Sequence, residues 1–332
     1  MKWICLQPSV RHLKRCLEGH FLLRSICMNQ RAKWTAILIF VPVAWGYNWV
    51  VMKRALAYCG PFAFSAIRFV LASLCLFAAL AALKRPFKVR PISGVIFAGL
   101  LQTGAQFGLV MWAMLTGPAG RSAVLDYTMP FWVVLMAWPV LGERPSRVQW
   151  LATIVAGVGL VLIFAASAGS GTADAAMLAT LGGLSWATGT VIARRLLTKS
   201  SMDTLALAAW QMLFGGLALA VMAVLVPGRA IVFSPYFFFA LFYTVVPATV
   251  LTWLFWFALL QRTEAGLASL TILATPVLGI VFGAVELGET PRGLEVFGMA
   301  VIAVALVIVG PIAMRSVQKR RVPMTKPEQA LR

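Results

Sequence analysis

Charged side chains are scarce in this chain. They account for 12% of its 332 residues, whereas 61% of the residues are hydrophobic. A soluble domain has about 25% charged residues, which cover its surface in water. The shortage, together with a mean hydropathy of +0.88, excludes a soluble globular protein and predicts that most of the surface faces lipid.

Residues that commonly carry out catalysis or hold metals are also few. The two histidines, His12 and His20, both precede the first apolar run, which excludes Ser-His proteolysis, His-based acyl transfer and a histidine zinc site within the membrane. Five cysteines without a C-x-x-C pair predict neither a metal site nor a disulfide framework. No G-x4-G-K-[ST] phosphate loop occurs, so no nucleotide or other cofactor is expected.

Long apolar runs take the place of the missing charge. A bilayer core requires about 20 apolar residues per helix, and ten such runs predict an all-α integral membrane protein. The predicted transmembrane helices cover residues 34–52, 62–83, 92–114, 119–141, 148–168, 174–193, 204–226, 236–260, 265–287 and 293–313.

The net charge of +19 would suggest nucleic acid as a partner of a soluble protein. In this chain, 23 of the 29 Lys and Arg residues lie on alternate loops and at the termini, on the side that holds the N-terminus. The positive-inside rule therefore predicts a multi-pass protein of the cell (inner) membrane with both termini in the cytoplasm. Anionic lipids at the cytoplasmic face are the expected partners, and nucleic acid is not; the oligomeric state is left open.

The chain contains an internal duplication with a spacing of 146 residues. Each copy spans five predicted helices, and an odd number inserts the second copy in the opposite sense, as in the inverted repeats of transporters. Glu143 and Glu289 each end a span before a proline-containing turn, which predicts a helix cap or a pair across a loop. The matching segments are Ala119-Gly120, Pro130 and Leu141-Gly142-Glu143 in the first copy and Ala265-Gly266, Pro276 and Leu287-Gly288-Glu289 in the second.

The duplication also sets the predicted domain boundaries. A cytoplasmic extension at 1–33 precedes the repeats at 34–168 and 174–313, and a basic cytoplasmic tail follows at 314–332. Residues 1–27 have two interpretations: a basic amphipathic helix on the inner leaflet, or a stretch ahead of a native start at Met28.

The order of several short motifs resembles a known family. Trp45-Gly46 and Asn48 lie in the first predicted span and Lys53 directly follows it, Arg68-Phe69 lies in the second, and Leu-Gly-Glu follows Pro130 and Pro276 in the two copies. In these features, over about residues 34–313, the chain is similar to the drug/metabolite transporter superfamily and, within it, to the ten-helix EamA-type carriers. The resemblance implies a secondary transporter, not an enzyme, that exports small metabolites or amino acids by alternating access, with proton coupling as an open alternative. A membrane sensor or assembly subunit that binds a ligand without transport is the other alternative.

Two charged residues inside the predicted spans are candidates for function, because an unpaired charge in a bilayer costs several kcal/mol. Arg68 and Asp126 both lie about 10 Å into spans that enter from the outer side, so their side chains can meet. Asp126 would bind a substrate amine or a coupling proton, and Arg68 would hold a carboxylate; a structural salt bridge is the alternative. Their repeat counterparts, Gln211 and Ile272, are uncharged.

Polar and aromatic residues at similar depth complete the predicted site. Trp45 and Trp186 occupy matching positions of the two copies, where they would stack on a substrate from two sides, with core packing as the alternative. For each polar residue the alternative is a hydrogen bond between helices. The predicted substrate-binding residues are Trp45, Asn48, Arg68, Gln106, Asp126, Tyr127, Trp186 and Gln211.

Prolines within the spans predict bends. Pro130 and Pro276 are repeat partners, and each removes the hydrogen bond to the carbonyl group four residues earlier. Kinks at equivalent places of opposed repeats would act as gates; a static kink that improves packing is the alternative.

Overall fold

The computed structural model describes residues 39–167, 173–200, 202–262 and 274–290, with single residues between 293 and 305. The chain divides into residues 1–40 and a compact unit from residue 41 onward, and the account below concerns the second unit. Met28 and the N-terminal extension, the joint at 168–172, the start of the ninth predicted span and the basic tail lie outside the described residues.

The described part of the chain is almost entirely helical and contains no strand, which confirms the all-α prediction. Six helices in it are long and apolar enough to cross a bilayer. The elements after the first helix (residues 41–55 of the unit) are α2 (Pro61–Ala82), α3 (Ile92–Gly99), η1 (Leu100–Ala105), α4 (Gln106–Thr116), α5 (Ala119–Asp126), α6 (Met129–Leu141), α7 (Arg147–Ser167), α8 (Ala173–Lys199), α9 (Thr204–Leu225), α10 (Pro235–Val245), η3 (Val246–Leu251), α11 (Thr252–Arg262) and α13 (Ala274–Leu287). The total of ten spans and the opposite insertion of the second copy stay predictions.

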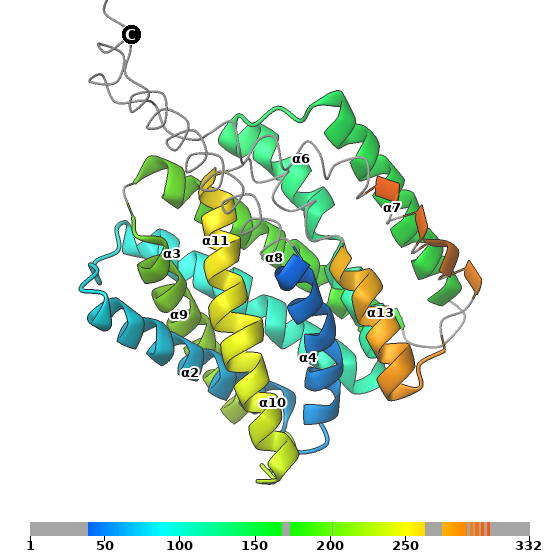
Figure 1. Cartoon of the computed structure of the whole chain (residues 1–332), viewed down its shortest axis with the longest axis horizontal. Helices are drawn as coiled ribbons and strands as arrows, with labels where there is room; N and C mark the ends of the chain where they lie inside the picture. The colour runs from blue at the N-terminus through cyan, green and yellow to red at the C-terminus, as the bar shows by residue number, and fades with distance from the viewer. Residues whose placement is uncertain are drawn as a thin grey trace, which may run out of the picture. The chain divides into compact units, whose positions relative to one another are not determined.

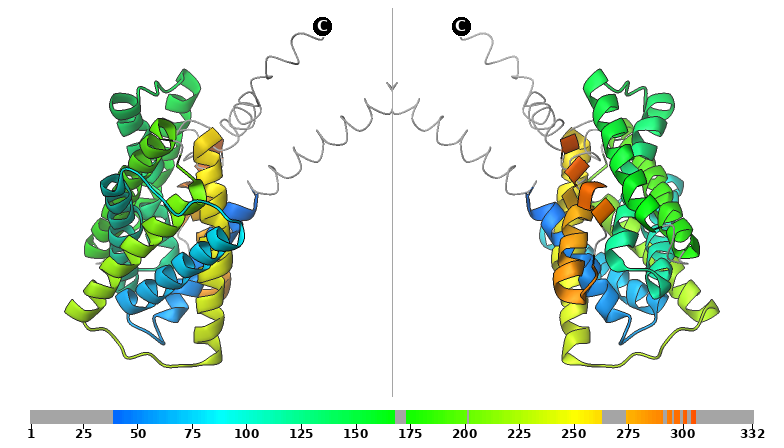
Figure 2. Two further views of the ribbon diagram at one scale, coloured as in Figure 1. Left: turned by 90° about the vertical axis from the view of Figure 1, so that its left-hand side faces the viewer. Right: turned by 90° about the vertical axis from the view of Figure 1, so that its right-hand side faces the viewer.

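Helices of the two sequence copies pack directly against each other. α2 lies along α9, α4 and α6 pack on α8, and α5 packs on α13 (Figure 1). The continuous helix formed by α10, η3 and α11 runs along one side of the unit (Figure 2). The candidate site described below is therefore built from both copies.

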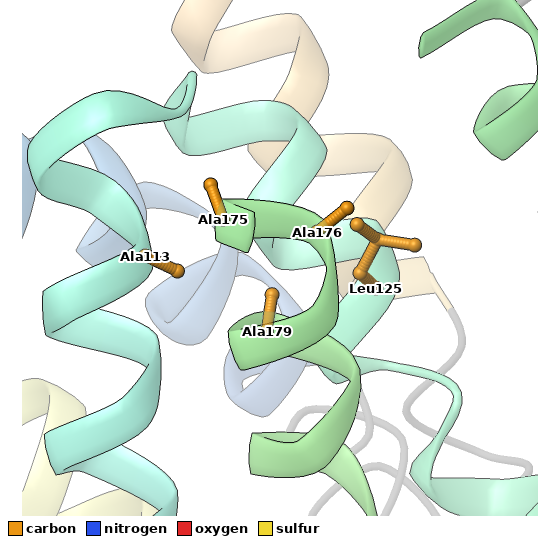
Figure 3. Close-up of a cluster of buried hydrophobic side chains, with 5 residues drawn as sticks. All are labelled: Ala113, Leu125, Ala175, Ala176 and Ala179. Atoms are coloured by element: carbon orange, nitrogen blue, oxygen red, sulfur yellow. The ribbon is translucent and has the colours of Figure 1, made fainter. Parts of the chain in front are cut away.

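Small side chains allow these close approaches. Ala113 of α4 and Leu125 of α5 meet three alanines of α8, Ala175, Ala176 and Ala179, in a buried cluster (Figure 3). Because apolar burial against lipid supplies little driving force between helices in a membrane, close van der Waals packing of small residues has to hold them together.

Two helices contain a π-helical turn at equivalent positions of the duplication. η1 interrupts the helix at 92–116, and η3 interrupts the helix at 235–257, at the same 146-residue spacing. Pro247 is the second residue of η3 and has no N–H to donate, whereas η1 contains no proline. Turns of this kind inside α-helices occur frequently at functional sites.

The span at 119–141 is interrupted in its middle. α5 ends at Asp126 and α6 begins at Met129, with Tyr127 at φ −76° and ψ 15°. Pro130 cannot donate a hydrogen bond to the Asp126 carbonyl group, and the helix is interrupted just before this proline, where the sequence predicted a bend. Its repeat partner Pro276 is the third residue of α13, and the residues before Ala274 are not described. The gating role of both prolines stays a prediction.

We expect Gly183→Ala to destabilise the protein. A Cβ atom at this position of α8 would collide with the carbonyl oxygen of Asp126 and lie 3.0 Å from Thr128 Oγ1. Gly157→Ala is the matched control, because its Cβ would approach nothing closer than 3.9 Å, on Phe131. Thermal unfolding in detergent should show a loss of about 1–3 kcal/mol for Gly183→Ala and a neutral or slightly stabilising effect for Gly157→Ala. Equal melting temperatures would contradict the close packing of α8 on the α5–α6 break.

Candidate functional site

A small cavity lies between the first helix and α4, α5, α8 and α11. The space open to the centres of water molecules is about 20 Å³, enough for about one water and too little for a metabolite. The lining residues are Trp45, Asn48, Trp49, Met52, Gln106, Phe107, Val110, Asp126, Tyr127, Trp186 and Trp253.

Asp126 carries the only carboxylate among the described lining residues, and one of its two carboxyl oxygens has a hydrogen bond. It is 1% exposed, and its Oδ2 accepts a hydrogen bond of 3.1 Å from Gln106 Nε2. The other oxygen, Oδ1, has no hydrogen-bond partner among the described residues. Gly182 of α8 leaves room beside it, since a Cβ there would lie 3.2 Å from Oδ1. The helix break therefore places an incompletely satisfied carboxyl group at the cavity.

Further polar atoms of the cavity lack partners within the described ranges. Asn48 Oδ1 and Gln106 Oε1 are buried acceptors without a donor, and the indole N–H groups of Trp186 and Trp253 are buried donors without an acceptor. A buried polar group without a partner costs about 1–3 kcal/mol. Such groups collect where water or a ligand completes the bonding.

Aromatic rings form much of the wall. Trp45 and Trp186 meet edge to face, with ring centroids 5.5 Å apart at 80°, and Tyr127 packs on Trp186 at 5.3 Å. Trp253 lies 6.1 Å from Trp45, whose Nε1 donates to the Ala248 carbonyl oxygen at 3.0 Å. The two tryptophans predicted to stack on a substrate from two sides thus touch each other, and a ring between them would require them to separate.

Arg68 lies next to the cavity without reaching it. Its Nε donates to Thr249 Oγ1 at 2.8 Å, and its Nη1 lies 3.1 Å from Met52 Sδ. The guanidinium carbon is 4.7 Å from the centre of the Phe107 ring. No ion pair joins Arg68 to any carboxylate in the described part of the chain. The pairing with Asp126 that their similar depth allowed is absent, because Met52 and Phe107 cover Arg68 on the side of the cavity.

Gln211, the repeat counterpart of Arg68, also lies outside the cavity lining. It is fully buried, and its Nε2 donates to Thr103 Oγ1 at 3.2 Å. Thr103 lies in η1 and Thr249 in η3, at equivalent positions of the duplication. Each copy thus bonds a residue of its second predicted helix to the π-helical turn of the other copy. In this structure Gln211 therefore forms a hydrogen bond between helices, which was the alternative to substrate binding.

Charged residues form contacts at both ends of the unit. At one end Glu289 accepts hydrogen bonds from the backbone N–H groups of Ala119 and Gly120, at 2.8 and 3.0 Å, and acts electrostatically on Lys53. At the other end Arg194 Nε lies 2.9 Å from Glu143 Oε1. In Figure 1 the C-terminal ends of the first helix and of α13 lie toward the bottom of the view, and the C-terminal ends of α6 and α8 lie toward the top. The sequence predicted that each glutamate caps the next helix or pairs across a loop; Glu289 instead caps α5 of the other copy, and Glu143 pairs with Arg194 near the end of α8.

Several lining residues were not predicted from the sequence. Trp49, Met52, Phe107 and Val110 are ordinary core residues by type, and no pattern distinguishes them. Trp253 is the counterpart of Phe107 at the 146-residue spacing, and its type and position do not distinguish it from a core tryptophan either. Of the eight predicted residues, six line the cavity, and Arg68 and Gln211 do not.

Comparison with known proteins gives a consistent picture. The EamA-like transporter family matches the chain twice, over residues 32–165 and 174–310. A relative from Salmonella typhimurium named "Probable amino-acid metabolite efflux pump" is 30% identical over 82% of this chain and 93% of its own length. The "Uncharacterized transporter YvbV" of Bacillus subtilis is also 30% identical, over 83% of this chain and 91% of its own.

More distant similarities cover most of the chain as well. The "Uncharacterized inner membrane transporter YedA" of Escherichia coli is 25% identical over 80% of this chain and 87% of its own length. One solved structure, described only as "Crystal structure of protein", aligns with a TM-score of 0.67 at 18% identity, over 86% of this chain and 98% of that one. This likeness shows the fold alone.

The two bonds to the π-helical turns allow a matched stability test. We expect a double-mutant cycle of Arg68→Met and Thr249→Val to give a coupling free energy of about 1.5–3 kcal/mol, because the donor is charged. The cycle of Gln211→Met and Thr103→Val joins neutral groups and should give about 0.5–1.5 kcal/mol. Unfolding in mixed detergent micelles measures both cycles. Equal couplings, or none, would show that Arg68 is held by something other than Thr249.

Proposed function

Because the chain belongs to the EamA-like transporter family, we propose that it is a secondary transporter that exports a small metabolite across the cell membrane by alternating access. The printed name of the Salmonella relative supports a substrate related to amino acids. The observation that carries the proposal is the half-bonded carboxyl group of Asp126 at a break in a membrane-spanning helix. Such a group is costly in a bilayer unless a ligand, a proton or water satisfies it.

In the proposed cycle, Asp126 binds either a substrate amine or a coupling proton. Either species neutralises the Asp126 carboxylate when it binds. Exchange of one for the other therefore avoids an uncompensated negative charge in a low-dielectric cavity. If the two compete for the same oxygen atoms, a proton that enters from the outside displaces the substrate and drives its exit. Competition for one group is sufficient for coupling, and no second ionisable site is required.

The charged clusters at the two ends are the proposed gates. Glu289 and Glu143 correspond in the duplication, and the positive-inside rule assigns Glu289 to the outer side. Glu289 binds the first N–H groups of α5, and Glu143 pairs with Arg194. The cavity between them holds about one water, so one end has to open before a metabolite can enter. Removing the contacts of one glutamate would favour opening at that end only, which is the behaviour expected of two opposed repeats.

We expect Asp126→Asn to abolish the response of export to external pH. In liposomes that contain the purified protein, wild-type export should rise as the external solution becomes more acidic, because protons displace substrate from Asp126. The amide cannot be protonated in this range, so its residual flux should be flat. Asp174→Asn is the control, since Asp174 is an exposed acid in the first turn of α8 and should leave the pH profile unchanged. Normal transport by Asp126→Asn at every external pH would show that proton coupling does not use this residue.

We further expect Glu289→Gln and Glu143→Gln to shift access to the cavity in opposite directions. The reporter is Val110→Cys in a chain whose five native cysteines are replaced, because Val110 lines the cavity and is 1% exposed. With a membrane-impermeant thiol reagent on sealed vesicles, Glu289→Gln should increase labelling from the outside and Glu143→Gln from the inside. Labelling that changes equally from both sides in either variant would argue for simple loosening of the fold and against gating.

A further inference from the structure

We propose, building on the transporter function above, that the cavity at Asp126 selects organic amines with a single positive charge and an apolar or aromatic body. Zwitterionic amino acids and organic anions would be excluded. The proposal rests on the charges, the unpartnered polar atoms and the rings that line the cavity, and it narrows "small metabolite" to one chemical class.

The charge of the lining is one-sided. Among the eleven described residues that line the cavity, Asp126 is the only acidic one and none is a lysine, arginine or histidine. A cationic amine neutralises the buried carboxylate on binding. The carboxylate of a zwitterion would enter the same cavity without a counter-ion, at the cost of desolvating an unpaired charge. The lining therefore favours a ligand whose net charge is positive.

Arg68 is the nearest buried cation, and it does not serve as that counter-ion. Its donors point to Thr249 Oγ1, to Met52 Sδ and, at 3.4 Å, to the Ala248 carbonyl oxygen. Its guanidinium also lies over two rings, at 4.8 Å from the centre of Phe69 and 4.7 Å from that of Phe107. A substrate carboxylate would reach it only by displacing Met52 or Phe107. This geometry argues against the role of carboxylate clamp that the sequence suggested for Arg68.

The unpartnered acceptors fit an ammonium group. Asp126 Oδ1, Asn48 Oδ1 and Gln106 Oε1 are buried without donors, and all three residues line the cavity. A primary ammonium has three N–H donors, which equals the number of these acceptors. A carboxylate has no hydrogen to donate to any of them. A bound amine would thus satisfy groups that otherwise lower the stability of the closed state.

The remaining lining fits the body of such an amine. Trp45, Trp49, Trp186, Trp253 and Tyr127 surround the polar cluster with aromatic surface. Faces of this kind attract cations and also bury apolar groups. The unpartnered indole N–H groups of Trp186 and Trp253 leave donors for a neutral acceptor on the ligand, such as a hydroxyl or carbonyl oxygen.

Four probes that share one phenol ring and differ in charge test the proposal: tyramine, tyrosine methyl ester, tyrosine, and 3-(4-hydroxyphenyl)propionate. In a mildly acidic buffer, which keeps the amine of the ester protonated, the first two are monocations, tyrosine is a zwitterion, and the last is an anion. Flux of each radiolabelled probe is measured in liposomes that contain the purified full chain, with protein-free liposomes to subtract passive leakage. We expect tyramine and the methyl ester to move at least about tenfold faster than tyrosine, and the propionate to stay at background.

Variants connect the selectivity to the lining. Asp126→Asn should reduce the flux of both monocations to a low, pH-independent residual level, whereas Asp174→Asn, which changes an exposed acid in the first turn of α8, should retain the flux. Arg68→Gln discriminates between the two models of charge recognition. If the covered guanidinium has no part in recognition, the ratio of tyramine to tyrosine flux stays as in wild type; a ratio that rises because tyrosine flux is lost would assign Arg68 to a substrate carboxylate and overturn the proposal.

The possible failures are distinct from failure of the transporter function. Faster flux of tyrosine than of tyramine or of its methyl ester would overturn the amine class, while the flux itself would support transport. Saturable binding of tyramine without flux would retain the ligand class and overturn transport. If none of the four probes binds or moves, the amine class is wrong, and the metabolites exported by cells with and without the protein then decide the transporter function separately.

Discussion

The cost of burying one carboxyl group in a low-dielectric interior is the constraint on which the described arrangement depends. Asp126 is placed at the point where α5 ends, and Pro130 prevents the helix from continuing through it. Glycines of α8 approach this break because any side chain at Gly183 would meet the Asp126 backbone. Gln106 satisfies one carboxyl oxygen and leaves the other to the cavity. Since an uncompensated charge in a membrane interior is expensive, this environment is best understood as half of a binding site whose other half is the ligand.

Comparison of the two copies distinguishes residues that hold the helices together from residues that line the candidate binding site. The second helix of each copy is bonded to a π-helical turn of the other, through Arg68 in one case and Gln211 in the other. The two bonds occupy equivalent places, although one donor is charged and the other is neutral. The positive charge of Arg68 is stabilised locally by its hydrogen bonds and by the rings of Phe69 and Phe107. The asymmetry that reaches the cavity is the carboxyl group of Asp126, whose sequence counterpart is Ile272. If the two copies are inserted in opposite senses, as the duplication predicts, this scaffold would move as two opposed halves and still bind a single ligand through one asymmetric charge.

The sequence was sufficient for features that depend on composition and spacing. Scarcity of charge predicted the all-helical membrane protein, and Pro130 predicted a bend where the structure has a break between α5 and α6. The repeated Glu289 predicted a cap, although the helix that it caps is α5 and not the next one along the chain. Features that depend on side-chain direction could not be obtained in the same way. Arg68 and Asp126 lie at similar depth, yet depth does not say on which face of a helix a residue points, and Phe107 and Met52 separate them. Trp253 was missed for a related reason, because a tryptophan in an apolar helix has the same appearance whether it packs in the core or lines a cavity.

Closure of the cavity gives the proposed amine a second role beyond occupying the site. With Trp45 and Trp186 in contact, the cavity has room for about one water, so an amine cannot enter without moving helices that the two copies contribute. In the proposed cycle, the contacts that loosen are the ring pair and the contacts of either Glu289 or Glu143. A ligand can shift such an equilibrium only by its difference in affinity for the two states. The unpartnered acceptors and indole N–H groups provide that difference, because they gain partners when an amine is bound and lose them when the cavity closes empty. The same atoms that select the charge of the substrate would then supply the free energy that couples its binding to movement of the helices.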